Sequence, residues 1–283
     1  MPPTFDPQQL PILAIDDHLP AVPSDRLTAT GVRERFARPA VWQPELVVER
    51  VLRQRALVHA SVLVPLVVRG DELTVLLTQR ADHLSDHPGQ ISFPGGRAEV
   101  GDLTAVATAL REAEEEIGLA AKHVQVLGTL PTYTTVTGFI VTPVVGLVEP
   151  GFELRVDPVE VADVFEVPLA FLMSPGHHRR HAVGEGDDVR EFFSMPWQAS
   201  VDGGPPQCRF IWGATAAMLR TFYCFLSACA ALDAAGIIEC DESFLGTLCA
   251  AARTAQAHAA RNGHPCGPDF VVAMGRPQFR CGP

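Results

Sequence analysis

The sequence predicts an α+β fold, or an α/β sandwich, for a chain of 283 residues. Short runs of valine, leucine and isoleucine recur between turns, a pattern typical of buried β-strands. One amphipathic helix pattern lies among these runs and a more apolar helix pattern follows them, an order that is typical of mixed folds. A hydrophobic fraction of 47% at this length suffices for a sizeable core.

Composition narrows the classes of function. A net charge of −11 argues against a nucleic-acid binder, since phosphate backbones are held by basic surfaces. The seven cysteines form no CxxC pair, which disfavours a zinc site, and their odd number disfavours a closed set of disulfides. The first residues show no basic region before an apolar run, and the most apolar stretch, 221–232, is too short to span a bilayer. We therefore expect a cytoplasmic protein with no membrane partner.

The chain divides into three predicted parts. Residues 1–57 form an N-terminal arm with one or two helices, residues 58–235 the main domain, and residues 236–283 a C-terminal helical extension and tail. The first 23 residues are rich in proline and predict a loose arm. Helix patterns follow, the first from Ser24 to before Pro39 and the second over 45–55.

The main domain alternates strand patterns with polar loops. Strands are predicted over 60–68, 73–78, 91–93, 124–130, 139–148, 161–167, 190–197 and 208–212. The last two form a hairpin around a Gly-Gly-Pro-Pro loop. Pro94-Gly95-Gly96 is expected to break the third strand as a turn. His177, His178 and His181 lie among arginines and a glycine, and this composition favours a solvated loop over a metal site. Helices are predicted over 106–117, 168–173, 214–235 and 243–262.

The first of these helices carries an unusual charge pattern. Asp102 is placed to cap it and Gly118 to end it. Glu112, Glu115 and Glu116 have i, i+3, i+4 spacing and share one face, where three like charges repel one another. One interpretation is a solvated acidic face; the other is a site for a hard divalent cation, for which carboxylates are the preferred ligands.

The stretch Gly96-x5-Asp102-x8-Arg111-Glu-Ala-x-Glu-Glu-x-Gly-Leu119 resembles the Nudix box, GX5EX7REUXEEXGU. The second half matches at every fixed position. The first half has Asp102 where the family has glutamate, and one extra residue before Arg111. The resemblance implies a Nudix α/β/α sandwich with a mixed sheet, within the predicted domain 58–235.

The segment before this box resembles a second signature. Leu76-Leu77-Thr78-Gln79-Arg80-Ala81, followed by Gly89-Gln90-Ile91-Ser92-Phe93-Pro94-Gly95-Gly96, is similar to LLTxR(S/A)x3Rx3Gx3FPGG of the coenzyme A pyrophosphatase branch. Ser85 stands in the place of its second arginine. The extra residue in the Nudix box is usual in this branch, and residues 211–216 resemble its closing strand-to-helix motif.

The resemblance implies roles for individual residues. Glu112, Glu115, Glu116 and the Gly96 backbone would bind Mg²⁺ or Mn²⁺, and Arg111 would orient a carboxylate. Arg80, Gly95 and Arg97 would contact the substrate phosphates. Two acids remain open as the general base, Glu115 on the helix and Glu160 in the loop before a strand.

The implied activity is metal-dependent hydrolysis of the diphosphate of coenzyme A or acyl-CoA to 3′,5′-ADP and (acyl-)4′-phosphopantetheine. Two alternatives remain. One is a Nudix pyrophosphatase of another nucleoside diphosphate derivative, such as ADP-ribose or a nucleotide sugar. The other is a non-catalytic Nudix-like module that binds a nucleotide. The partner is then a small-molecule nucleotide, and the apolar final helices could form a homodimer interface.

Overall fold

The computed structural model describes residues 5–45, 57–84, 87–184, 189–199 and 207–228. The helices predicted over 45–55 and 243–262, and the last part of the helix predicted over 214–235, lie outside the described residues. None of the helices within these ranges is long and apolar enough to cross a membrane.

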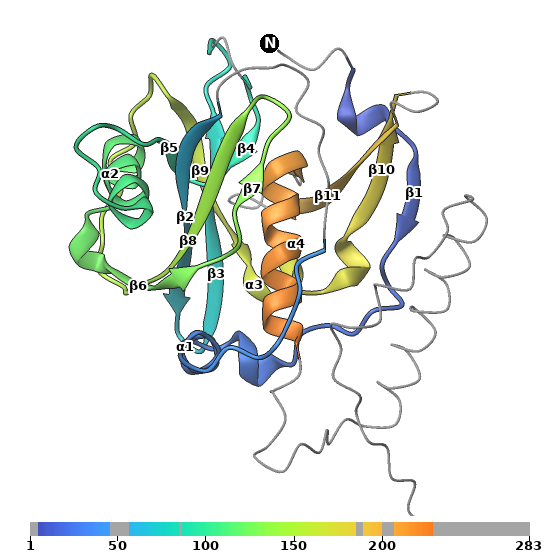
Figure 1. Cartoon of the computed structure of the whole chain (residues 1–283), viewed down its shortest axis with the longest axis horizontal. Coiled ribbons are helices and arrows are strands. Elements are labelled where there is room, and N and C mark those ends of the chain that lie inside the picture. The colour runs from blue at the N-terminus through green and yellow to red at the C-terminus, as the bar shows by residue number, and fades with distance from the viewer. Residues whose placement is uncertain (1–4, 46–56, 85–86, 185–188, 200–206, 229–283) are drawn as a thin grey trace, which may run out of the picture. The chain divides into compact units, whose positions relative to one another are not determined.

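A mixed eight-stranded sheet forms the centre of the fold (Figure 1). Its main path is β4-β3-β2-β8-β6, and β5, β7 and β9 pair with β2, β8 and β3. Strands β2 and β8 are parallel over ten residue pairs, and the other pairs are antiparallel. The bounds are β2 Val58–Arg69, β3 Glu72–Arg80, β4 Ile91–Ser92, β5 Gly95–Arg97, β6 Val124–Thr129, β7 Tyr133–Thr134, β8 Phe139–Val148 and β9 Val161–Pro168. The predicted strands of this region are confirmed.

Helices cover both faces of this sheet, which gives the predicted α/β/α layers (Figure 1). Helix α2, Ala105–Ile117, packs on one face, where Leu76 of β3 joins its buried cluster. Helix α4, Gly213–Ser227, packs on the other face with Leu77. Successive side chains of a strand point to opposite faces, so β3 contributes to both cores. Shorter helices are η1 Pro7–Gln9, η2 Ser24–Leu27, α1 Ala29–Ala37, η3 Ala121–His123, α3 Leu169–Leu172 and η4 Pro175–His177.

A second, antiparallel sheet has the strand order β1-β10-β11-β12. Its strands are β1 Ile12–Ile15, β10 Arg179–Val183, β11 Arg190–Ala199 and β12 Gln207–Trp212. The predicted hairpin is confirmed as β11 and β12. Two predictions are wrong here. The proline-rich arm is not loose throughout, because β1 pairs with β10 at the sheet edge. His178 and His181 are not solvated, since they are 0% and 3% exposed.

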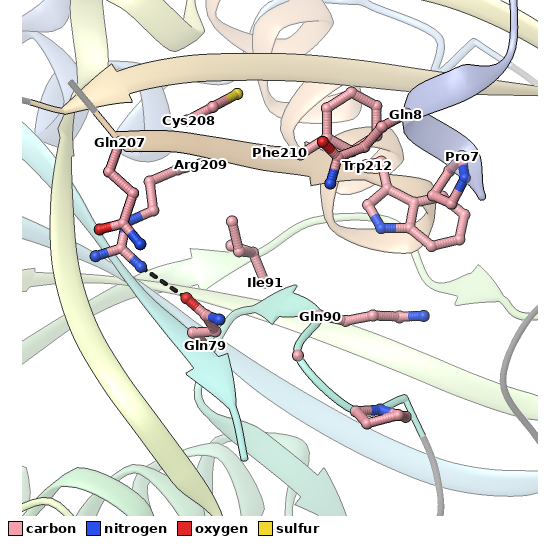
Figure 2. Close-up of a pocket in the computed structure, with 12 residues that line it drawn as sticks. Pro7, Gln8, Gln79, Gln90, Ile91, Gln207, Cys208, Arg209, Phe210 and Trp212 are labelled. Carbon is pink, nitrogen blue, oxygen red and sulfur yellow. Dashed lines mark hydrogen bonds between the residues drawn. The ribbon is translucent and has the colours of Figure 1, made fainter. Parts of the chain in front are cut away.

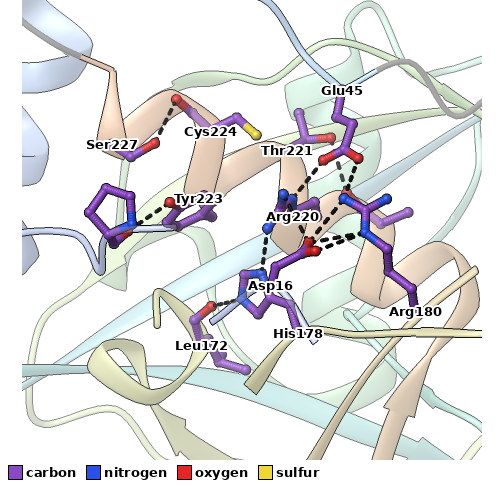
Figure 3. A network of polar contacts seen from close by, with 12 residues as sticks. Asp16, Glu45, Leu172, His178, Arg180, Arg220, Thr221, Tyr223, Cys224 and Ser227 are labelled. Carbon is purple, nitrogen blue, oxygen red and sulfur yellow. Dashed lines mark hydrogen bonds and ion pairs between the residues drawn. The ribbon is translucent and has the colours of Figure 1, made fainter. Parts of the chain in front are cut away.

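A buried ionic network ties the arm to the domain (Figure 3). Asp16, directly after β1, is 2% exposed and pairs with Arg180 at 2.9 Å and Arg220 at 3.1 Å. Glu45 pairs with the same two arginines, at 2.6 and 2.8 Å. His178 donates from Nε2 to the Leu172 carbonyl, so its Nδ1 accepts from Arg220 at 3.1 Å. Burial lowers the pKa of His178 to about 4, which keeps the ring neutral at pH 7.

Candidate active site

Helix α2 begins and ends on local signals in its sequence. The Thr104 side chain accepts a hydrogen bond from the Ala107 N–H at 3.1 Å, so Thr104 is the N-cap and the prediction of Asp102 was wrong. Asp102 instead accepts from the Glu99 N–H and faces Arg111. Gly118 ends the helix in the left-handed conformation, at φ 70°, as predicted.

Glu116 is the most buried acid on the predicted face. Its side chain accepts a hydrogen bond from the Gly95 N–H at 3.1 Å, and the residue is 5% exposed. Burial raises the pKa of Glu116 to about 7, against the opposing effects of the Gly95 bond and the Arg80 charge. The negative charges of Glu112 and Glu160 raise this pKa further. The protonated and the charged forms of this carboxyl group are therefore both populated near neutral pH.

Gly95 and Gly96 pack tightly between helix α2 and strand β2. Gly95 and Gly96 belong to β5, which pairs with β2, so this segment is a short strand and not the predicted turn. A Cβ on Gly95, at φ 155°, would lie 2.4 Å from the Ser61 carbonyl oxygen. A Cβ on Gly96 would lie 2.6 Å from the Glu112 carboxylate. At Gly95 a side chain would clash with the backbone of β2, and at Gly96 it would displace the Glu112 carboxylate.

Arg111 organises the exposed side of the face. Its guanidinium donates to Asp102 at 3.2 and 2.9 Å, and to the Arg97 carbonyl at 2.9 Å. It also pairs with Glu112 at 3.0 Å and with Glu115 at 2.7 Å. The bond from Arg111 is the main cause that lowers the pKa of Asp102, whereas burial raises the pKa of Glu112. Arg111 therefore orients three carboxylates at once.

Two further arginines differ in their surroundings. Arg80, the last residue of β3, has a buried Nε with no hydrogen-bond partner among the described residues. Its charge acts on Glu116. Arg97 is exposed at the end of β5, with its guanidinium 5.2 Å from the centre of the Phe139 ring. Arg80 therefore faces the buried acid, and Arg97 lies at the rim.

Glu160 lies beside the same acids. Its loop is held from two sides, because the Asp157 N–H donates to the Glu116 carbonyl and the Ala81 N–H to the Glu160 carbonyl, each at 2.9 Å. The Glu160 side chain is exposed, and its charge raises the pKa of both Glu112 and Glu116. The sheet end and helix α2 thus bring Glu160 close to the acidic face.

The donor set fits a hard divalent cation. No three histidine, cysteine, aspartate or glutamate side chains of the described ranges converge as a ready metal site, and Arg111 holds Glu112 and Glu115. Two carboxyl groups with raised pKa values nevertheless lie against a glycine backbone that a Cβ would obstruct. A cation would offset the burial of their charges, and its ligands would be oxygens.

Arg209 was not found from the sequence. It comes from β12 and donates to Gln79 of β3 at 2.6 Å, and its Nε has no hydrogen-bond partner among the described residues. The two residues lie 130 positions apart, and no local spacing indicates their contact.

Comparisons with known proteins show a family relationship. The family model of the NUDIX domain matches residues 57–191 of this chain. The chain is 40% identical over 198 residues to "Uncharacterized Nudix hydrolase NudL" of Salmonella newport (strain SL254), covering 70% of this chain and 94% of that protein. The protein of the same description from Salmonella dublin is 39% identical with the same coverage. Among solved structures, a C. elegans Ap4A hydrolase binary complex has a TM-score of 0.35 and 18% identity, covering 42% of this chain and 86% of that chain.

Proposed function

The chain belongs to the Nudix hydrolase family, and on this basis we propose that it hydrolyses the diphosphate bond of coenzyme A or acyl-CoA. The products are 3′,5′-ADP and 4′-phosphopantetheine or its acyl form, and the reaction depends on Mg²⁺ or Mn²⁺. The observation that carries the proposal is the path of residues 76–96. Of these residues, 76–80 lie in β3, 91–92 in β4 and 95–96 in β5; the Gly95 N–H donates to Glu116, and the charge of Arg80 acts on the same carboxyl group.

Each side chain has a role that follows from its position. Glu112, Glu115, Glu116 and the Gly96 backbone would hold the cation. When bound, the cation neutralises charge on the diphosphate and brings the pKa of a bound water from about 15.7 towards 7. Arg80, whose buried Nε has no hydrogen-bond partner among the described residues, would donate to a phosphate oxygen, and Arg97 would do so from the rim.

Glu160 is the proposed general base. Arg111 already holds Glu115 in a hydrogen bond of 2.7 Å, so the Glu115 carboxylate is engaged with a side chain and is less free to turn towards a water. The Glu160 side chain is exposed and its charge acts on both Glu112 and Glu116, where attacking water would be bound. It would take a proton from that water as the water attacks one phosphorus and the other phosphate leaves.

The experiment is to incubate the purified protein with coenzyme A and Mg²⁺ or Mn²⁺ and to separate the nucleotides. We expect 3′,5′-ADP in the presence of either metal and none with EDTA. A lack of 3′,5′-ADP under both metals would overturn the proposal.

A second candidate is a Nudix pyrophosphatase of ADP-ribose or a nucleotide sugar. Ser85, in the place of the second arginine of the coenzyme A signature, favours it, although this position lies outside the described residues. Comparing kcat/KM for coenzyme A with that for ADP-ribose and a nucleotide sugar decides between the two. If no diphosphate is hydrolysed, the chain is a binding module.

A further inference from the structure

A pocket lies between the second sheet and the ends of β3 and β4 (Figure 2). Its volume is about 270 Å³, and its walls come from η1, residues 88–91, Gln79 and β12. Figure 2 shows Ile91 pointing into the space between the strands. Whole-ligand sites measure about 300–1,000 Å³, so this pocket fits one ring-sized part of a nucleotide.

The pocket presents fixed hydrogen-bond donors. Gln79 accepts through Oε1 from Arg209 Nη1 at 2.6 Å, and Gln90 accepts through Oε1 from His87 Nδ1 at 3.0 Å. These bonds set the orientation of both side-chain amides. The NH2 group of each is then left with no hydrogen-bond partner within the described ranges. Both residues are partly exposed, so their NH2 groups can donate to acceptor atoms of a ligand in the pocket.

The pocket is close to electrically neutral. None of its lining residues is Asp, Glu or Lys, and its single guanidinium is that of Arg209. Arg209 is 4% exposed, pairs with Asp163 and lies 4.5 Å from the centre of the Phe165 ring. A phosphate would have to compete with Asp163 for this charge, whereas a neutral ring would not.

Aromatic side chains complete the wall. Trp212 and Phe210 of β12 line the pocket beside Gln8 of η1, as Figure 2 shows. A flat π-system stacks on such rings, and its edge is then open to hydrogen bonds. The adenine ring is flat and neutral and bears acceptor nitrogens, so it matches both the rings and the amide donors.

We propose that this pocket binds the adenine base of the nucleotide half of the substrate. The proposal rests on the proposed function and extends it. Gln79 and Arg80 are consecutive on β3, and the Arg80 N–H donates to the Gln90 carbonyl at 2.9 Å. Because side chains alternate along a strand, Gln79 faces the pocket and Arg80 faces Glu116. A substrate that passes over this strand end places its base and its diphosphate in the two sites.

The test measures binding without turnover. Adenosine 3′,5′-bisphosphate, AMP, 4′-phosphopantetheine and pyrophosphate are each titrated into the full chain without metal, with tryptophan fluorescence and calorimetry as readouts. Gln90→Leu removes one amide donor; Gln198→Leu makes the same change at an exposed position on β11 that does not line the pocket. We expect Gln90→Leu to raise the Kd of both adenine nucleotides about tenfold. Gln198→Leu should leave these values unchanged.

Three further outcomes decide the proposal. With Gln90→Leu, the Kd of pyrophosphate should not change, and the KM of the substrate should rise with kcat within about twofold. Trp212→Phe should abolish the fluorescence change caused by the adenine nucleotides. Unchanged nucleotide binding in a folded Gln90→Leu variant would overturn the proposal, as would an equal loss of 4′-phosphopantetheine binding. Because the nucleotide titrations need no hydrolysis, failure of the proposed activity does not affect their result.

Discussion

The carboxylate of Glu116 accepts a hydrogen bond from the Gly95 N–H at 3.1 Å, so the acidic helix and the glycine strand meet at a buried acid. A glutamine at this position could keep the bond through its carbonyl oxygen but would carry no charge. The contact therefore allows the charge of Glu116 to be tested apart from its shape.

Glu116→Gln should lower the rate of diphosphate hydrolysis by about a hundredfold or more, because a cation ligand is lost. Glu114→Gln is the matched control, since Glu114 is exposed on the same helix. The measurements are kcat with Mg²⁺ and the thermal unfolding of each variant. Near-normal turnover in a folded Glu116→Gln protein would show that this face is not the metal site.

The stability of the metal-free protein should fall as pH rises. The pKa of Glu116 is raised to about 7 from its ordinary value of 4.5, so between these values the folded state binds more protons than the unfolded state. The stabilisation from this group is complete below about pH 4.5 and lost as pH passes 7, on the order of 3 kcal/mol. Urea unfolding with EDTA at pH 5 and 8 measures this change. Glu116→Gln should remove it, and an equal pH dependence in both proteins would contradict the assignment.

Asp102→Asn should leave Arg111, and through it the carboxylates of Glu112 and Glu115, less firmly oriented. Arg111 would lose its paired bonds to Asp102 while still contacting Glu112 and Glu115. Residues that orient metal ligands typically contribute about 10- to 100-fold to affinity or activity. We expect a drop of about tenfold in kcat and weaker Mg²⁺ binding by calorimetry. Asp71→Asn, in an exposed turn, is the control, and equal effects of the two variants would show that Asp102 has no such role.

Glu160→Gln should lower kcat by about a hundredfold and leave Mg²⁺ affinity unchanged, because a general base acts on water and does not hold the cation. Its matched control is Glu153→Gln, an exposed acid of the same loop. A large loss in Glu115→Gln with normal turnover in Glu160→Gln would assign the base to Glu115 instead.

Asp16→Asn should destabilise the fold by about 3 kcal/mol, because it leaves the buried Arg220 with Glu45 as its one acidic partner among the described residues. Asp17→Asn changes the neighbouring exposed acid and should have little effect. The free energy of unfolding in urea measures both. Equal stability of the two variants would mean that the ionic network makes no net contribution to the free energy of unfolding.

The sequence predicted the features that depend on local patterns. The central strands and helix α2 follow from periodicity, and Gly118 ends α2 through its own backbone freedom. The sequence also indicated the neighbours Glu112 and Glu116, because helical spacing determines that they share a face. These features need no information from distant parts of the chain.

The remaining features depend on contacts between distant residues. Strand β1 pairs with the distant strand β10, and the buried His178 contacts Arg220 and Tyr223 of α4. Thr104, not Asp102, caps α2, and the Asp102 side chain instead binds the Glu99 N–H and Arg111, nine residues along. A sequence pattern does not show such competition between partners.

Side chains at the end of β3 alternate between the two faces of the sheet, and this alternation restricts insertions and deletions within the strand. Removing one residue between Leu73 and Thr78 would move Gln79 to the face of Glu116 and Arg80 to the face of Trp212. Every core side chain beyond the deletion would change faces as well. We therefore expect insertions and deletions to accumulate in the loop from Ala81, while the spacing from Leu73 to Arg80 stays fixed.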